Sequence, residues 1–224
     1  MKLNKLAMLL AIAFLATTFT TAKAQISVGA TAGFNMQNIT GKNANGDNLS
    51  NKLAPRYTIG LNISVPLATE FAVQVGASFA TKGAESSDKY TKTTLNYVEI
   101  PLNLVYKPLL GDNHLLLGFG PYMGIGVGGR SKTTISGVTL DRKVVYKNSV
   151  AAKEMVTTSE VYYRPIDAGV NLLAGYEFSN GFSFQFNAQL GLTKINTTVS
   201  DVSSDKTSLK NTGFGVSVGY RIMR

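Results

Sequence analysis

Hydrophobic and polar residues alternate along several segments of the chain. From Phe182 to Thr193, and again from Phe214 to Ile222, every second residue is apolar and each residue between is polar or glycine. A period of two is typical of a β-strand, because successive side chains of a strand point to opposite faces. Six further segments follow the pattern with local slippage: Ile26–Met36, Tyr57–Val65, Phe71–Thr81, Leu95–Lys107, Leu115–Gly128 and Ile166–Phe178.

The connections between these eight segments alternate in length. Three are short, at 66–70, 108–114 and 179–181, and the last contains an Asn-Gly pair that favours a hairpin turn. The other four, near 37–56, 82–94, 129–165 and 194–212, are longer and polar. An even strand count, with both chain ends on the short-turn side, is the layout of an outer-membrane barrel. The pattern predicts an all-β fold, an eight-stranded antiparallel up-and-down transmembrane β-barrel.

The residue types on the two faces favour a membrane barrel over a secreted lipocalin-like barrel or a sandwich. The polar faces of four segments hold small neutral residues and no charge, which suits a narrow lumen filled by side chains. In the fifth segment we expect Tyr122 to point inward, beside glycines that share its parity: Gly118, Gly120, Gly124, Gly126 and Gly128. We assign the apolar faces to lipid.

Aromatic residues near the segment ends are candidates for the girdles at the two membrane interfaces, the alternative being the core of a soluble β-domain. They are Tyr57, Phe71, Tyr106, Tyr176, Phe178, Phe182 and Tyr220.

The N-terminus has the form of an export signal. A basic start precedes an apolar run from Leu6 to about Phe19, and Ala22-Lys23-Ala24 provides a small-x-small cleavage site. We expect residues 1–24 to be a signal peptide cleaved after Ala24, and 25–224 to form the barrel domain in the cell outer membrane. The net charge of +9 includes three lysines of the signal, so the mature chain carries +6. That moderate excess on an exported chain does not favour nucleic acid, and the lack of cysteine excludes disulfides and a lipid-modified cysteine.

Several motifs resemble the PorT-like outer-membrane β-barrel proteins over essentially the whole mature chain. The most specific match is Tyr97-Val98-Glu99-Ile100-Pro101-Leu102, and the opening Gly29-x-x-x-Gly33-x-Asn35 is similar to that family's first strand. Gly120-Pro121-Tyr122, Asp167-x-Gly169, Gly175-Tyr176-Glu177 and Gly219-Tyr220-Arg221 follow in the same order. The resemblance implies a role in protein secretion or surface display for some members.

Charged residues on the predicted inward faces form the candidate site. Parity places Glu99, Asp167, Glu177 and Arg221 in the lumen, and Arg56, Lys82 and Lys107 near strand ends. An unpaired charge in a lumen of low dielectric constant is costly, so we expect these residues to form a network of ion pairs. The functional alternative is a narrow gated pore or a proton-accessible site.

Enzymatic chemistry has little support in the sequence. Small barrel enzymes place a nucleophile and a histidine near the outer rim, whereas the single histidine, His114, falls in a predicted periplasmic turn as a solvated residue. A carboxylate pair remains open as an acid–base alternative. No phosphate-binding loop or metal-ligand cluster is recognisable, so we predict no enzyme and no cofactor.

The longest external segment, about 131–159, carries a local excess of three positive charges and would face anionic lipopolysaccharide. Its residue content predicts that the flanking strands continue beyond the membrane as a hairpin. We expect a monomeric barrel that contacts outer-membrane lipid and lipopolysaccharide, with a protein as a further possible partner. The first functional hypothesis is a structural, interaction or secretion-supporting barrel acting through its loops or turns. The alternatives are a narrow channel and a barrel enzyme acting on lipid or peptide.

Overall fold

The structure is a computed structural model that describes residues 26–157, 159–200 and 206–222. The predicted signal peptide at 1–24 lies outside these residues. Within them, the chain is almost entirely β-structure, with one short helix, α2, at Ala152–Thr157.

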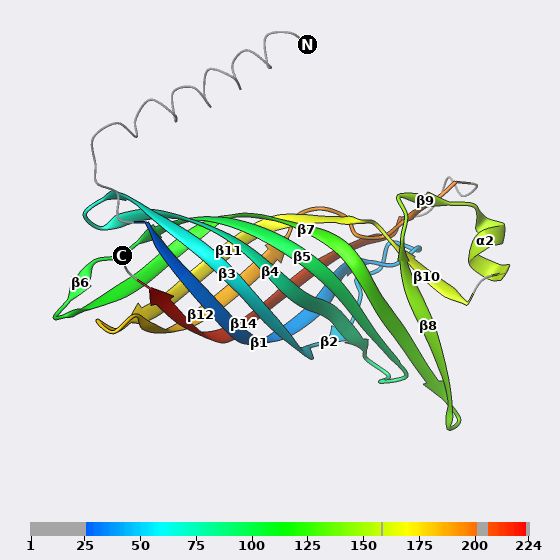
Figure 1. Cartoon of the computed structure of the whole chain (residues 1–224). Helices are drawn as coiled ribbons and strands as arrows, with labels where there is room; N and C mark the ends of the chain where they lie inside the picture. Colours follow the sequence, from blue (N-terminus) through cyan, green and yellow to red (C-terminus); the bar gives the residue numbers. More distant parts are fainter. Residues whose placement is uncertain (1–25, 158, 201–205, 223–224) are drawn as a thin grey trace, which may run out of the picture.

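Eight long antiparallel strands form a closed ring, which confirms the predicted fold (Figure 1). Each pairs with the next along the chain, and β14 closes the ring on β1 from Val28–Ile222 to Lys42–Ser208. Closure pairs the backbone groups of every strand, as a membrane-spanning sheet requires. The eight strands are β1 (Ser27–Lys42), β3 (Ala54–Ala68), β4 (Phe71–Ser86), β5 (Thr91–Tyr106), β7 (Asn113–Ile135), β11 (Ile166–Glu177), β12 (Phe182–Gly191) and β14 (Ser208–Ile222).

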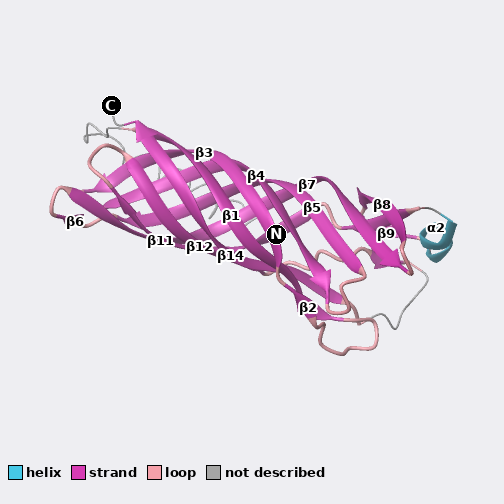
Figure 2. Ribbon diagram, turned by 90° about the horizontal axis from the view of Figure 1, so that it is seen from below, coloured by secondary structure: helices cyan, strands magenta, loops and turns pink. Residues whose placement is uncertain are grey.

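The two ends of the barrel differ as the connection lengths predict. The short turns gather at one end together with both ends of the described chain (Figures 1 and 2). A two-residue strand, β6 (Leu109–Leu110), also lies at this end, which we call the periplasmic end. At the opposite, external end lie the short elements β2 (Asn51–Lys52), β8 (Val138–Tyr146), β9 (Ser149–Val150), β10 (Glu160–Tyr163) and β13 (Thr198–Val199), with α2.

Several strands run further outward than the alternation alone indicated. β7 continues to Ile135, and β14 begins at Ser208, inside a segment expected to be a loop. The external hairpin exists, but different strands form it than predicted: β7 pairs with β8 rather than with the next barrel strand. β8 returns toward the barrel, where β10 adds to it in parallel. Backbone pairing extends these strands after the apolar alternation has ended.

The outward face is apolar and exposed, whereas the lumen is polar and buried. Phe184 and Leu61 on the outside are 52% and 63% exposed, whereas Asn62 and Asn171 inside are 7% and 8% exposed. This inversion of the usual soluble arrangement places the apolar side chains against lipid. Part of the proposed aromatic girdle is in contact at the periplasmic end, where the ring centroids of Phe71 and Tyr106 lie 4.9 Å apart.

Glycines in the lumen make room for aromatic side chains. Tyr122 is 3% exposed, and a Cβ atom on Gly169 would lie 2.8 Å from its ring. A Cβ atom on Gly126 would overlap the ring of Tyr146 in the same way. The run of same-parity glycines in β7 therefore belongs to the packing of a narrow, filled barrel. Among the described residues, no helix is long and apolar enough to span a membrane.

Candidate functional site

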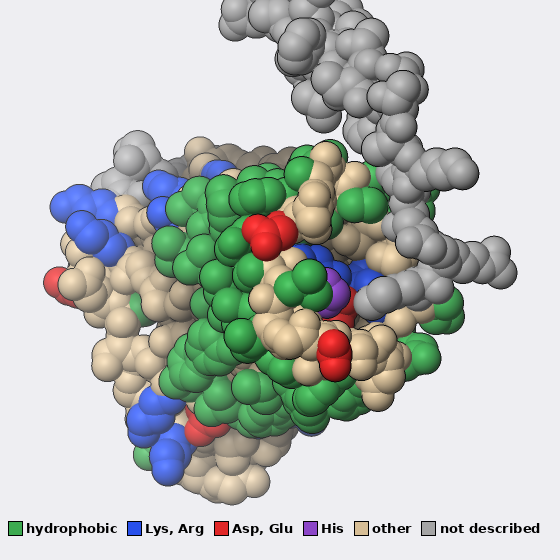
Figure 3. All heavy atoms as spheres, turned by 90° about the vertical axis from the view of Figure 1, so that its left-hand side faces the viewer, with side chains coloured by type: hydrophobic (Ala, Val, Ile, Leu, Met, Phe, Trp, Pro, Cys, Tyr) green, Lys and Arg blue, Asp and Glu red, His purple; other side chains and the backbone are tan. Residues whose placement is uncertain are grey.

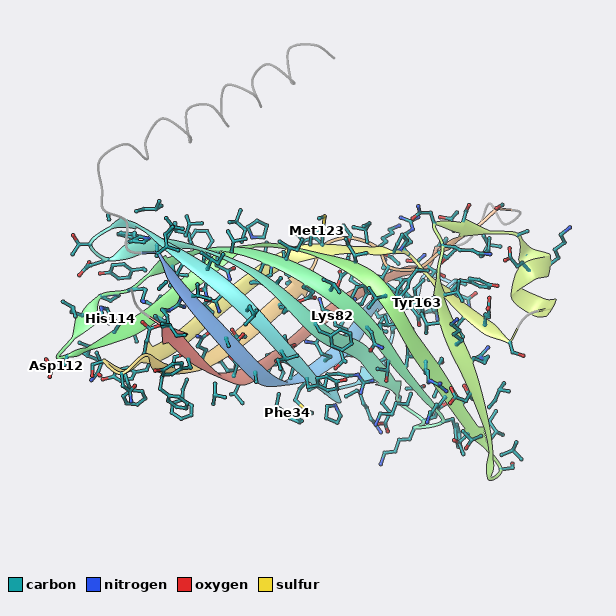
Figure 4. The ribbon with its side chains drawn as sticks, in the orientation of Figure 1. Phe34, Lys82, Asp112, His114, Met123 and Tyr163 are labelled. Carbon is teal, nitrogen blue, oxygen red and sulfur yellow. The ribbon has the colours of Figure 1, made fainter. Side chains whose placement is uncertain are left out.

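A buried ion cluster lies inside the barrel and joins three of its strands. Lys82 extends from β4, Glu99 from β5 and Asp167 from β11. Nζ of Lys82 lies 2.5 Å from Oε1 of Glu99 and 2.9 Å from Oδ2 of Asp167, and none of the three side chains is more than 3% exposed. Figure 4 shows Lys82 within the ring of strands. We call this group the Lys82 cluster.

Aromatic and amide groups surround the Lys82 cluster. The ammonium lies 4.2 Å from the ring centre of Tyr122, whose hydroxyl group is 3.4 Å from both carboxylate oxygens of Asp167. Nδ2 of Asn211 donates to Oδ2 of Asp167 at 2.9 Å, and Nε2 of Gln189 donates to Oε2 of Glu99 at 3.1 Å. Buried charges are tolerated when hydrogen bonds supplement their ion pairs, and this shell provides them.

Arg56 supplies a second cation beside the cluster. Its guanidinium donates from Nε to the carbonyl oxygen of Lys82 at 3.0 Å and from Nη2 to that of Thr93 at 2.6 Å. The guanidinium therefore ties together the backbone of β4 and β5 next to Lys82. Arg56 thus contacts backbone carbonyls, and the structure gives it no ion pair within hydrogen-bonding reach of Glu99 or Asp167.

A second ion cluster lies at the periplasmic end. Glu177, 1% exposed, receives Nζ of Lys107 at 2.7 Å and Nε of Arg221 at 3.0 Å. Arg221 also lies 3.4 Å from the hydroxyl of Ser27, so this cluster links both ends of the described chain. We call it the Glu177 cluster.

His114 lies beside the Glu177 cluster and corrects a prediction. It is the second residue of β7, opposite Glu177 in the strand register, and not a solvated turn residue. The tight pairing of β6 with the start of β7 draws it into the sheet. Its Nδ1 atom is buried without a hydrogen-bond partner in the described structure. Figure 3 shows the histidine at the centre of the periplasmic end, with basic and acidic groups around it.

Two apolar layers accompany the ion clusters along the barrel axis. Lys107, just after β5, and the inward residues of β5 give the order from the periplasmic end: Lys107, Val105, Asn103, Glu99 and Leu95. Val105 packs with Leu116 and Leu173 just inside the Glu177 cluster, and we call these three residues the inner apolar layer. Outside the Lys82 cluster lies a larger layer, the external plug: Ile39, Ala84, Leu95, Tyr97, Val144, Tyr163 and Ile195.

A cavity of about 130 Å³ lies between the inner apolar layer and the Lys82 cluster. Asn35, Gln37, Asn62, Asn103 and Asn187 are among its lining residues, and Glu99 reaches it from the external side. Its walls therefore combine amide and hydroxyl groups with apolar side chains and one carboxylate, and an ion cluster and an apolar cluster lie toward each end of the barrel.

The predicted site residues thus divide into two groups. Lys82, Glu99 and Asp167 meet in one cluster with Arg56 beside it, and Lys107, Glu177 and Arg221 meet in the other. Lys82 is not near a strand end as expected, because β4 continues past it to Ser86. Sequence reasoning missed Gln189 and Asn211 as partners. The parity of Gln189 could have identified it, whereas Asn211 lies in the segment taken for a loop.

The positions of possible metal ligands and of the single histidine bear on the chemistry of the two clusters. Among the described residues, no group of three or more His, Cys, Asp or Glu side chains could hold a metal ion. His114 and the Lys82 cluster lie on opposite sides of the inner apolar layer. Outside the membrane, a hydrogen bond to Glu154 raises the pKa of Lys147, and burial raises the pKa of Tyr163. Both groups are protonated at neutral pH with their ordinary pKa values, so these upward shifts do not change their charge there.

Residues 20–197 match the family model of the outer membrane protein β-barrel domain. Solved structures with similar folds share little sequence identity. Neisserial surface protein A is 12% identical over 89% of this chain and 97% of its own, with a TM-score of 0.47. OprG from Pseudomonas aeruginosa is 11% identical over 90% and 98%, with a TM-score of 0.47. Ail of Yersinia pestis, in complex with the heparin analogue sucrose octasulfate, is 13% identical over 88% and 99%, with a TM-score of 0.41. Among curated proteins, no sequence matches the chain.

Proposed function

The chain belongs to the family of outer-membrane proteins with a β-barrel domain, and we propose that it is a closed, non-conducting barrel that presents an interaction surface outside the cell. The observation that carries this proposal is the closure of the lumen on both sides of its cavity. A solute would have to displace the external plug and the Lys82 cluster, and then the inner apolar layer and the Glu177 cluster. Each ion cluster would leave unpaired buried charges if it separated.

Planar-bilayer recording tests closure. We expect the purified barrel to insert without a measurable single-channel current at neutral pH, because buried ion pairs and apolar side chains occupy the lumen on both sides of the cavity. The comparison variant is Leu95→Ala/Tyr97→Ala/Leu116→Ala/Leu173→Ala, which removes side chains from the external plug and from the apolar cluster near the periplasmic end and should pass more current than the unmodified protein. Steady unitary currents from the unmodified protein would instead support the narrow-channel alternative.

The external elements support an interaction role. The hairpin of β7 and β8 extends from the barrel mouth, and its tip exposes Ile135 and Val138 at 61% and 73%. Loops held on a rigid scaffold are frequent binding sites, and exposed apolar residues there favour a partner over plain solvent. The enzyme alternative is weaker, since Glu99 and Asp167 are 3% and 0% exposed and lie behind the external plug.

Cysteine labelling tests the orientation of this surface, because the native chain has no cysteine. A membrane-impermeant maleimide added to intact cells should label Ser136→Cys at the hairpin tip. It should label Asp112→Cys, in a periplasmic turn, only after the outer membrane is permeabilised. The reverse pattern would place the hairpin in the periplasm and contradict the proposal.

Two narrower assignments belong to the same proposal. The segment from Tyr97 to Leu102, which lies in β5, supports membership of the PorT-like group and therefore a secretion-supporting or display role. The basic start and the Ala22-Lys23-Ala24 site support removal of residues 1–24, so that the mature barrel begins at Gln25. N-terminal sequencing of the purified protein tests the cleavage position.

A further inference from the structure

Basic side chains gather on the outward face of the sheet where it extends beyond the barrel mouth. In the strand register, Lys92 of β5 lies directly opposite Lys132 of β7, and Arg130 of β7 lies directly opposite Lys143 of β8. Directly opposed residues project to the same face of a sheet. These four cations therefore form two adjacent rows on one surface, which we call the basic face.

This arrangement is unfavourable for the sheet alone. Like charges directly opposite each other on neighbouring strands destabilise the pairing. Asp141 offsets part of the repulsion, since it lies 2.9 Å from Arg130 and 3.9 Å from Lys132. The remaining excess of positive charge is what a bound polyanion would neutralise.

The basic face points away from the lumen. Ser131, between Arg130 and Lys132, is 2% exposed and faces the buried Thr93 across the strands, so its two neighbours point outward. Lys143 precedes Val144, which is buried in the external plug, and the same alternation turns Lys143 outward. The basic face thus continues the lipid-facing side of the barrel.

The distance from the apolar belt places the basic face near the lipid headgroups. Val127 is the last exposed apolar residue of β7 before Arg130, which lies three residues further outward along the strand. Three residues of strand span about 10 Å, which for a strand tilted by about 40° is roughly 8 Å along the membrane normal. This is the depth of the headgroup layer just outside the hydrocarbon core.

The hairpin also overhangs the membrane. In Figure 1, β7 and β8 lean sideways so that the tip lies beyond the outline of the barrel wall. Figure 3, viewed from the periplasmic end, shows Lys and Arg side chains beyond the edge of the apolar wall.

We propose that the basic face binds the phosphate groups of a phosphorylated saccharolipid in the outer leaflet and so seats the hairpin on the membrane surface. Charge complementarity supports this partner, because the phosphates of such a lipid form an anionic layer that begins near the height of Arg130, with the other cations beside it or further outward. A soluble polyanion would approach the opposite face of the hairpin, which meets water. The strand register places the exposed apolar side chains of Ile135, Val138 and Leu140 on that face. The inference rests on the proposed function for one point only, the placement of the hairpin outside the cell.

Native mass spectrometry of the full mature barrel in a neutral detergent tests the inference, with purified lipid A carrying two phosphates as the probe. We expect saturable binding by the unmodified protein. The variant Lys92→Gln/Lys132→Gln/Lys143→Gln should bind on the order of 100-fold more weakly, since each lysine near an anionic surface contributes about a fivefold factor. Raising the salt concentration should weaken binding by the unmodified protein as well.

The matched control is Lys42→Gln/Lys153→Gln/Lys194→Gln, which removes the same charge from exposed external positions away from the basic face. It should bind like the unmodified protein, and lipid A without phosphates should not compete. Three outcomes would overturn the assignment: an equal loss of lipid A affinity in both triple variants, equally strong binding of dephosphorylated lipid A, or displacement of lipid A by soluble heparin. Heat-modifiable gel migration confirms folding of each variant. If lipid A does not bind but Ser136→Cys is labelled on intact cells, the lipid site alone is rejected. If the labelling pattern of Ser136→Cys and Asp112→Cys is reversed, the proposed function is rejected too.

Discussion

Replacing Lys82 with Met should be among the most destabilising single substitutions in the barrel. The change leaves Glu99 and Asp167 buried without their shared cation, and breaking a buried ion pair in this way costs about 3–5 kcal/mol. Met keeps the length of the side chain, so little of the loss should come from an empty space. The measurement is the urea midpoint for unfolding from lipid vesicles, followed by loss of the compact band on an unheated gel.

Two further variants isolate the cause. Lys92→Met, at an exposed position of the basic face, should change the midpoint little, which controls for loss of a lysine. Lys82→Met/Glu99→Gln/Asp167→Asn removes all three charges and should recover most of the stability, because no unpaired charge remains. If Lys82→Met costs less than about 1 kcal/mol, the cluster is solvated and the closed lumen is wrong.

Replacing Phe186 with Arg should have the largest effect on membrane insertion. Phe186 lies near the middle of β12, is 50% exposed and packs against Phe214 with ring centroids 6.3 Å apart. An arginine on the lipid face at the bilayer midplane costs about 2–4 kcal/mol. The folded fraction in vesicles of neutral lipid should fall accordingly, as read from gel migration over a urea series.

The matched control for Phe186→Arg is Thr139→Arg, on the external hairpin, where water can solvate the guanidinium. A third variant, Phe186→Leu, keeps the site apolar and should cost much less than the arginine. If Phe186→Arg folds as well as Thr139→Arg, the outward face of β12 does not lie in hydrocarbon, and the assignment of the exposed apolar band to lipid fails.

Local patterning accounts for most of the fold. The alternation in β12 and β14 could be recognised from the residues alone, because each side chain of a strand meets one of two constant environments. The lengths of the connections then ordered the strands and separated the two ends. Outside the membrane this logic no longer applies, since both faces are exposed near the tip of the hairpin of β7 and β8, and the hairpin therefore left no clear period-two signal.

The amino-acid sequence by itself determined the barrel class, the inward parity of Glu99 and Asp167 and the need for their charges to be balanced. Only the tertiary structure decided which charges meet, because strand register brings Lys82 to a carboxylate 85 positions further along the chain. It also decided that Val144, Tyr163 and Ile195, from segments outside the predicted barrel core, close the external mouth. Periodicity is a property of one strand, whereas ion pairing and lumen closure depend on the relative shift of strands around the ring.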